Sequence, residues 1–538
     1  MVPTRGHQGR ESRFSCPRPH FFKENTVSQD LHTHPDGVDR AKLKLTFVAV
    51  VSVLLLASLG QTVVTTALPI IVGELGGLDQ ITWVITAYLM AATVGAPVFG
   101  KLGDLYGRKR VLQIGIGVFL VGSLLSASAG SIWTLVLGRF VQGLGGGGLI
   151  VVSMATVADV VPPRQRGRYQ GFLGGVFGFS TVIGPLAGGF IVQHFHWSWM
   201  FLLNVPLGLV AFTILAIVLE SLPPRRKPVI DYAGAGLLAA TLSLAVIIAS
   251  IGGNPVPWTS PVMLALYAAL AVALGAFITA EYRAKEPVLP LQLFRINNFV
   301  VSNTVGTIIG VAMFGTITFV PMFMQVVKGL SPAQSGLFIF PMMLGMITAS
   351  TLSGIFMSRT GRYRILPVFS TLLLAVAMGA LSTLSPSTPN WLIVVCVMAA
   401  GIGIGPVMGV GVTAIQNSVP GNMVGVGTAS ANMFRLIGGS LGTALFGAIF
   451  SHGLTRELGS ALGGANPRAL TAQAISAMDP DLQAQVGLGI AHALQPVFLI
   501  GAVMACLACL VALLMVELPL SDRVPDRNSN EPATVPAE

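Results

Sequence analysis

Long apolar runs separated by short polar turns make up most of the sequence after residue 44. Most of these runs have about 20 residues, the length that an α-helix needs to cross the hydrocarbon core of a bilayer. The pattern predicts an all-α integral membrane protein with fourteen transmembrane helices. Their expected ranges are 45–66, 82–100, 111–129, 133–158, 170–192, 199–219, 232–252, 261–281, 299–321, 335–357, 365–384, 391–414, 424–450 and 494–516.

The composition supports this interpretation. Only 10% of the 538 residues are charged, 53% are hydrophobic, and the mean hydropathy is +0.77. A soluble protein carries about 25% charged residues, so this chain could not cover a globular surface with polar groups. The net charge of +10 does not indicate nucleic-acid binding, because Lys and Arg lie in short loops between apolar runs. Their excess in alternate loops predicts a multi-pass protein of the cell membrane, surrounded by lipids, with both termini cytoplasmic.

The chain contains an internal repeat. Residues 100–110 (GKLGDLYGRKR) align with residues 354–364 (GIFMSRTGRYR), and each stretch joins the second and third helices of a six-helix unit. Two further helices lie between the units, and two such bundles around a midplane site form a layout of alternating-access transporters. The expected divisions are a cytoplasmic tail 1–44, an N-terminal bundle 45–220, an inserted helix pair with its linker 221–285, a C-terminal bundle 286–518 and a tail 519–538.

The first repeat carries an acid that the second lacks. Glycines allow the sharp turn, and the cations at 101 and 108–110 hold it on the cytoplasmic side. Asp104 stands among them, and Ser358 occupies its place in the second copy. A turn that serves only as an anchor needs no acid, so we expect Asp104 to have a specific partner. The alternative is an incidental charge in a positive-inside turn.

Several stretches resemble motifs of the major facilitator superfamily, and within it the fourteen-helix drug:proton antiporters of the EmrB/QacA-like group. The resemblance covers about 45–450. The matching stretches, in chain order, are 100–110, 137–143 (LGRFVQG), 158–168 (ADVVPPRQRGR), 184–189 (GPLAGG) and 321–332 (PMFMQVVKGLSP). The resemblance implies two six-helix bundles and an export function.

The resemblance also implies roles for individual residues. Asp104 would cap the start of a helix in the C-terminal half, and Arg108 would pair with Asp159, so that these contacts latch one state of the transporter. The glycines and proline of the antiporter motif would set the export direction and seal the cavity; they are Gly184, Pro185, Gly188 and Gly189, with Ser180 in place of one glycine of the usual pattern. Plain helix packing is the alternative for this motif.

Two arginines lie inside expected spans. A buried Arg is costly unless it is paired or faces water, so Arg139 in helix 4 is expected to face the central cavity, with Gln142 on the same side of the helix. The resemblance implies a part in proton or substrate coupling, and the alternative is a structural hydrogen bond to a neighbouring carbonyl. Arg435 in helix 13 is its counterpart, either lining the cavity or packed.

Helix 1 departs from the resembled group. That group carries a membrane-embedded Asp in helix 1, whereas Gly60 stands there in this chain, and none of the 21 Asp and Glu residues falls in the middle of a predicted span. Proton coupling would then use peripheral acids such as Glu74, Asp79 or Asp159, or be absent. A cavity with buried cations and no buried acid also favours neutral or anionic lipophilic substrates.

Other candidate cavity residues are aromatic or amide side chains on helices that line the cavity in this fold. They are Gln61, Trp83, Tyr88, Gln142, Asn303, Phe323, Gln325 and Asn432. Ordinary packing is the alternative for each of them.

The expected function is export of small lipophilic compounds, drugs or toxic metabolites, in exchange for protons. The alternatives are an exporter of one metabolite or siderophore, an uptake symporter or facilitator, and a receptor with this fold. No metal, cofactor or enzymatic activity is expected, since the sequence has no zinc spacing, nucleophile triad or nucleotide loop. A periplasmic or outer-membrane partner is left open.

Overall fold

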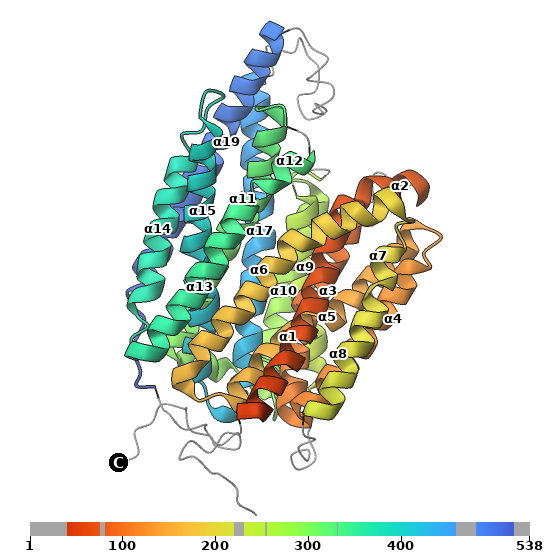
Figure 1. Ribbon diagram of the computed structural model, residues 1–538, viewed down its shortest axis with the longest axis vertical. Helices are drawn as coiled ribbons and strands as arrows, with labels where there is room; N and C mark the ends of the chain where they lie inside the picture. The colour runs from red at the N-terminus through yellow and green to blue at the C-terminus, as the bar shows by residue number, and fades with distance from the viewer. Residues whose placement is uncertain are drawn as a thin grey trace, which may run out of the picture. The chain divides into compact units, whose positions relative to one another are not determined.

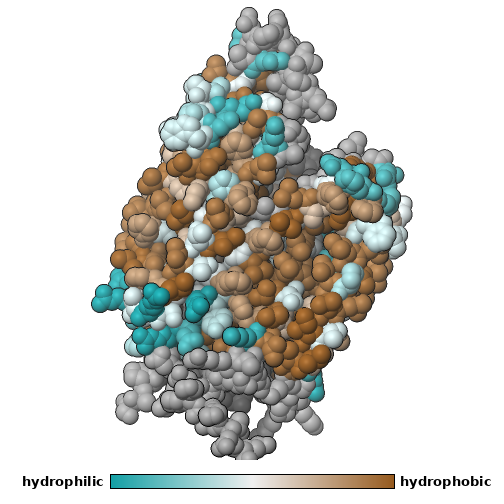
Figure 2. All heavy atoms as spheres, viewed as in Figure 1, coloured by the Kyte–Doolittle hydropathy of each residue, from teal (hydrophilic) through white to brown (hydrophobic). Residues whose placement is uncertain are grey.

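The computed structural model describes residues 40–75, 81–219, 231–252, 256–330, 332–458 and 480–520. Within these ranges the regular elements are helices, and thirteen of them are long and apolar enough to cross a membrane. The shorter apolar helix Ile365–Leu381 stands where the remaining span is expected. Hydrophobic side chains cover the middle of the helices, and hydrophilic ones gather near their ends (Figure 2). The predicted all-α membrane fold is confirmed.

In the part of the first half that the structure describes, there are eight α-helices. They are α1 (Arg40–Thr62), α2 (Leu68–Leu75), α3 (Ile81–Tyr106), α4 (Arg108–Ala127), α5 (Ile132–Val160), α6 (Pro163–His194), α7 (Trp199–Leu202) and α8 (Asn204–Val218). The first expected span ends early, because the 3-10 turn Val63–Thr66 separates α1 from α2. Helix α5 packs closely on α3 and α4, since a Cβ at Gly147 would overlap the Ala92 carbonyl and one at Gly145 would lie 2.6 Å from the Phe119 nitrogen.

The inserted pair consists of α9 (Tyr232–Ile251) and α10 (Pro261–Arg283). Each begins with a side-chain cap: Asp231 accepts a hydrogen bond from the Gly234 nitrogen, and Ser260 accepts one from the Met263 nitrogen. Helix α9 packs against α3 and α17, whereas α10 packs against α9. The outer helix α10 therefore presents a large apolar surface to the surrounding lipid.

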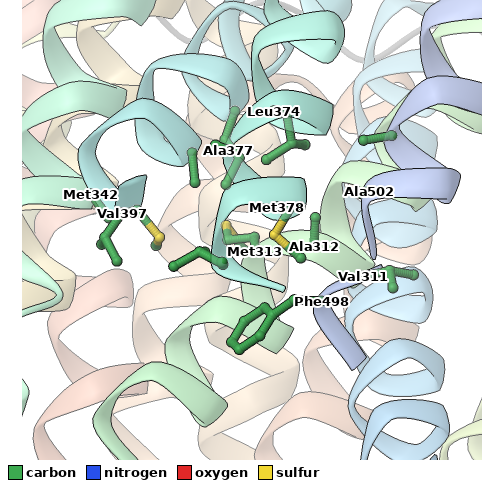
Figure 3. Packing of buried hydrophobic residues seen from close by; sticks show 14 of the residues in the cluster. Val311, Ala312, Met313, Met342, Leu374, Ala377, Met378, Val397, Phe498 and Ala502 are labelled. Atoms are coloured by element: carbon green, nitrogen blue, oxygen red, sulfur yellow. The ribbon is translucent and has the colours of Figure 1, made fainter. Parts of the chain in front are cut away.

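The second half follows the 3-10 turn Leu291–Arg295. Its helices are α11 (Asn297–Val326), α12 (Pro332–Leu337), α13 (Phe340–Thr360), α14 (Ile365–Leu381), α15 (Asn390–Pro406), α16 (Val412–Ser418), α17 (Val424–Leu458) and α19 (Pro480–Ala512). A π-helical turn, Val407–Gly411, joins α15 to α16. Met342, Met378 and Phe498 belong to a large buried cluster in this half, which Figure 3 shows from close by.

The structure describes the segment 452–492 only at its two ends. Helix α17 continues to Leu458, and α19 already begins at Pro480. The intervening residues 459–479 lie outside the described ranges, as do residues 1–39 and 521–538 of the expected tails. Helix α1 begins at Arg40, inside the expected N-terminal tail.

The two halves meet along two helix pairs. Helix α3 packs against α17, and α6 packs against α13, which runs beside it in Figure 1. Both pairs are tight at the end of the bundle where the chain turns at Gly107, Pro162, Gly361 and Pro420; we call this the basic end. There a Cβ at Gly100 would lie 2.9 Å from the Gly425 carbonyl oxygen, and one at Gly354 would overlap the Gly167 carbonyl.

Candidate functional site

The turn between α3 and α4 brings an acid to the start of a distant helix. Gly107 ends α3 with a φ of 91°, a conformation that favours glycine. One helical turn earlier, the Asp104 carboxylate accepts hydrogen bonds from the backbone nitrogens of Gly425 and Val426, both at 3.1 Å. These nitrogens lie in the first turn of α17, where free N–H groups and the helix dipole favour an anion. The contact expected from the resemblance is thus present.

Arg108 links Asp104 to a second acid. Its Nη2 lies 2.7 Å from Asp104 Oδ1, and its Nε lies 2.8 Å from Asp159 Oδ2, on the last turn of α5. Asp104 and Arg108 are both buried, and Asp159 is half-buried. Because buried charges are stable only when they are paired, the three side chains and the start of α17 form one unit, which we call the Asp104 cluster. Its role as a latch stays a prediction.

A second polar connection at the basic end was not identified from the sequence. Arg166 on α6 is 2% exposed and donates to the carbonyl oxygens of Ala158 at 2.7 Å and Gln416 at 3.2 Å, and to Asn417 Oδ1 at 2.9 Å. The next turn of α6 places Gln170 Nε2 2.8 Å from the Met154 carbonyl and 3.3 Å from Gln416 Oε1. Arg166 therefore ties the end of α5 to the end of α16, across the two halves.

A signal for this connection exists in the sequence. Residues 159–162 (DVVP) and 417–420 (NSVP) have the same spacing from acid or amide to proline, which places Asn417 opposite Asp159 in the repeat. Arg164, Arg166 and Arg168 all lie in the stretch 158–168 that resembles a family motif, and the sequence does not distinguish them. Burial distinguishes them, because Arg168 is exposed whereas Arg166 is not.

Arg139 is the centre of a buried polar cluster in the first half. It is 1% exposed, and its Nη1 donates to the Gly60 carbonyl oxygen at 2.8 Å and to Gln142 Oε1 at 2.6 Å. Its guanidinium carbon lies 4.2 Å from the centre of the Tyr88 ring. These are the contacts of the structural alternative, a hydrogen bond to a neighbouring carbonyl. A role in coupling stays a prediction.

Gly60 occupies a crowded position. A Cβ there would overlap the ring of Phe119, which is itself fully buried on α4. An acidic side chain at residue 60 would therefore need the space that this ring fills. The glycine at residue 60 and the position of the Phe119 ring therefore depend on each other.

Arg435 has fewer oxygen partners than Arg139. It is 7% exposed, donates to Asn432 Oδ1, and places Nη1 3.0 Å from the sulfur of Met408 in the π-helical turn. Its guanidinium carbon lies 5.8 Å from the centre of the Phe177 ring, on α6 of the other half. Arg435 and Asn432 thus lie together where the two halves meet.

The remaining candidate cavity residues are dispersed. Gln61 and Trp83 are half-buried, and the Tyr88 hydroxyl donates to the Ala57 carbonyl at 3.1 Å. Asn303 is buried and donates to the Phe299 carbonyl within α11. Phe323 is fully buried in the core of the second half, the position that ordinary packing predicts. Gln325 donates to Ser335 at 2.8 Å and so joins α11 to α12.

The antiporter motif lies where α6 passes the end of α1. A Cβ at Gly184 would overlap the Thr62 hydroxyl, whereas one at Gly189 would meet nothing within 4 Å. Gly188 is buried, and the side chain of Pro185 lies outside the described parts. Ser180 receives a hydrogen bond from the Ser58 hydroxyl at 2.8 Å, and its carbonyl receives one from Thr62 at 3.0 Å. The exceptional serine therefore binds α6 to α1.

The second repeat keeps the backbone of the first with different chemistry. Gly361 has a φ of 71° and its counterpart Gly107 has a φ of 91°, so both turns use a positive φ. Instead of an acid on a helix start, the Ser358 carbonyl accepts from Arg164 Nε at 3.2 Å. The Tyr363 nitrogen donates to Glu517 Oε1 at 2.7 Å, and burial raises the pKa of the Tyr363 phenol, which stays a hydrogen-bond donor to the Val516 carbonyl. Among the described residues no group of His, Cys, Asp and Glu has a metal-site arrangement.

Comparisons with known proteins identify the family. The model of the Major Facilitator Superfamily matches residues 50–443. An uncharacterized MFS-type transporter of Mycobacterium tuberculosis is 41% identical over 479 residues, which are 88% of this chain and 70% of that protein. The multidrug transporter protein MdtP of Bacillus subtilis is 35% identical over 414 residues, 77% of this chain and 76% of that one.

A solved structure shares the fold. The proton:xylose symporter XylE, bound to a bromodeoxyglucose, superimposes with a TM-score of 0.59 over 87% of this chain and 95% of its own, at 15% sequence identity. The chain belongs to the major facilitator superfamily and is a multi-pass membrane transporter of small substrates, not an enzyme.

Proposed function

We propose that the protein exports small lipophilic compounds by alternating access, in exchange for protons, as a member of the fourteen-helix drug:proton antiporter group. The two moving parts would be the bundles 45–220 and 286–518, with the inserted pair 221–285 between them in the sequence. The basic end would face the cytoplasm, with both termini on that side of the cell membrane.

The observation that carries the proposal is the Asp104 cluster. Asp104 on α3 holds the first turn of α17 in the other half, and Arg108 shares its charge between Asp104 and Asp159. Two bundles can rock only if contacts at one end form and break. A charged cap on a helix start suits this purpose, because its strength falls steeply with distance.

The export direction is supported by two observations. The relative MdtP is named a multidrug transporter, and the chain carries the stretch 184–189 that resembles the antiporter motif. In this chain Gly184 allows α6 to touch α1 next to the 3-10 turn that ends it. An uptake symporter is the alternative of another class, and it lacks such support.

Proton exchange requires groups that titrate. Among the described residues the buried acids are Asp104 and Glu281, both at the basic end, and half-buried Asp159 shares Arg108 with Asp104. At the opposite end, exposed Glu74 accepts from Trp197 Nε1 at 2.8 Å and lies 3.1 Å from His196. These peripheral acids are the proposed proton sites; Asp79 lies outside the described residues.

The test is the accumulation of a panel of fluorescent drugs in cells with and without the protein, at an acidic and a neutral external pH. An exporter driven by protons lowers accumulation, and more strongly at acidic external pH. Equal accumulation in both cell types for every compound would overturn the export proposal. Export of a single endogenous metabolite, the other alternative, predicts that one compound of a metabolite panel is moved and the drugs are not.

A further inference from the structure

The two buried arginines inside the spans, Arg139 and Arg435, differ in how well the protein satisfies them. A guanidinium has five N–H donors and no acceptor. Arg139 donates to the oxygens of Gly60, Gln142 and Val84. Arg435 donates to one oxygen, that of Asn432, and its other described partner is the sulfur of Met408. Sulfur of a thioether is a weak acceptor, so Arg435 keeps unused capacity to bind an anion.

Two further donors, one beside Arg435 and one near the turn that holds Met408, lack partners within the described residues. Asn432 is 3% exposed; its Oδ1 faces Arg435 and its Nδ2 has no hydrogen-bond partner. Ser350 on α13 is 1% exposed, and its Oγ is also unpartnered. That hydroxyl lies 3.2 Å from the Cβ position of Gly174, which is 3.9 Å from Met408 Cβ. Buried donors are normally satisfied, so the unpartnered Asn432 amide beside a cation indicates a ligand.

The rest of the surroundings is apolar and adaptable. Phe177 of α6 faces Arg435, and Met346 on α13 places its methyl 2.7 Å from the Cβ position of Gly178, the next residue of α6. Methionine side chains are flexible and fit ligands of different shape. Met408 lies in the π-helical turn Val407–Gly411, directly after Pro406, which cannot donate a helical hydrogen bond. Such turns often accompany functional sites.

We propose that Arg435 and Asn432 bind the negatively charged end of a lipophilic organic anion, a carboxylate or a phenolate, and that Phe177 and the methionines hold its apolar body. The anion replaces the Met408 sulfur at Arg435. This inference rests on the proposed export function and names its substrate class. Since Phe177 belongs to one half and the other residues to the second, the ligand would be held by both moving parts.

The test uses the full-length protein in proteoliposomes and three probes of different charge. The probes are the lipophilic anion anilinonaphthalene sulfonate, neutral Nile red and cationic ethidium. Arg435→Gln should weaken anion binding about tenfold or more, the loss expected for one charge-assisted hydrogen bond, and leave Nile red binding nearly unchanged. Arg456→Gln is the matched control, because it makes the same change at an exposed position in the last turn of the same helix.

A second variant keeps the inference testable if Arg435→Gln does not fold. Asn432→Asp is nearly isosteric and supplies Arg435 with a carboxylate of its own, so it should exclude the anion and admit ethidium. Equal loss of anion and Nile red binding in the variants would show that Arg435 is structural and overturn the site. If the wild type exports Nile red or ethidium but neither binds nor exports the anion, the site is refuted and export stands. If the anion binds through Arg435 but no compound moves, the site stands and export is refuted.

Discussion

Arg139 donates a hydrogen bond of 2.8 Å to the carbonyl oxygen of Gly60, the residue that stands where related antiporters are expected to carry an acid. The backbone thus supplies the acceptor that a carboxylate would otherwise provide. Because a carbonyl does not titrate, this contact cannot release or take up a proton. The proposed proton sites are therefore the peripheral acids.

Gly60→Ala tests how tightly this arrangement is fixed. A Cβ would overlap the buried Phe119 ring, and overpacking of a core typically costs about 1–3 kcal/mol. We expect a lower thermal unfolding temperature in detergent. Gly117→Ala on α4 is the matched control, since nothing lies within 4 Å of its Cβ position, and it should leave the temperature nearly unchanged. Equal stability of both variants would contradict the observed crowding.

Asp104→Asn tests the latch. The amide keeps the shape but removes the charge that pairs with Arg108 and the helix start, and hydrogen bonds to charged groups contribute about 1.5–3 kcal/mol. We expect the basic end to open more often and the export rate to fall about tenfold or more. Export and the labelling rate of a cysteine placed at this end are measured together.

The control for the latch is Ser358→Ala. Ser358 occupies the same place in the second repeat, but its described contact uses the backbone carbonyl, so this variant should transport normally. Wild-type export by Asp104→Asn would refute the latch and leave Asp104 as an incidental charge.

Arg166→Lys tests the connection that the sequence did not reveal. A lysine ammonium cannot reach the carbonyls of Ala158 and Gln416 and the Asn417 side chain together, as the planar guanidinium does. We expect a loss of stability of about 2–4 kcal/mol, because buried acceptors lose their donor. Arg168→Lys, at an exposed position two residues on, should be neutral. Similar unfolding of both variants would show that Arg166 contributes nothing across the halves.

The paired glycines of the repeat should respond differently to alanine. At Gly354 a Cβ overlaps the backbone carbonyl of Gly167, whereas at Gly100 the nearest atom is the Ala429 methyl at 2.8 Å. The Gly425 carbonyl oxygen also lies 2.9 Å from the Cβ position of Gly100, so both positions meet backbone atoms. Because the overlap at Gly354 is the closer one, Gly354→Ala should slow transport more than Gly100→Ala. Gly379→Ala, with nothing within 4 Å, serves as the control, and an initial export rate is the measurement. If Gly100→Ala slowed transport more than Gly354→Ala, the contact between α6 and α13 would be less tight than the structure shows.

The sequence alone determined the membrane fold. Hydrophobic run length is set by bilayer thickness, so the spans could be predicted from single stretches, although α1, α17 and α19 differ at their ends. The repeat also showed that Asp104 is special, because Ser358 stands in its place. Turn glycines and basic loops depend on short stretches of sequence, so they can be predicted from those stretches alone.

Only the tertiary structure decided which polar groups meet. Three arginines at 164, 166 and 168 look alike in the sequence, yet one is buried between the halves. The same holds for Arg139, whose carbonyl partners come from α1 and α3, and for Arg435, which lies beside a sulfur and an unpartnered amide donor. A hydrogen bond depends on atoms that packing brings within 3 Å, and the sequence does not contain that distance.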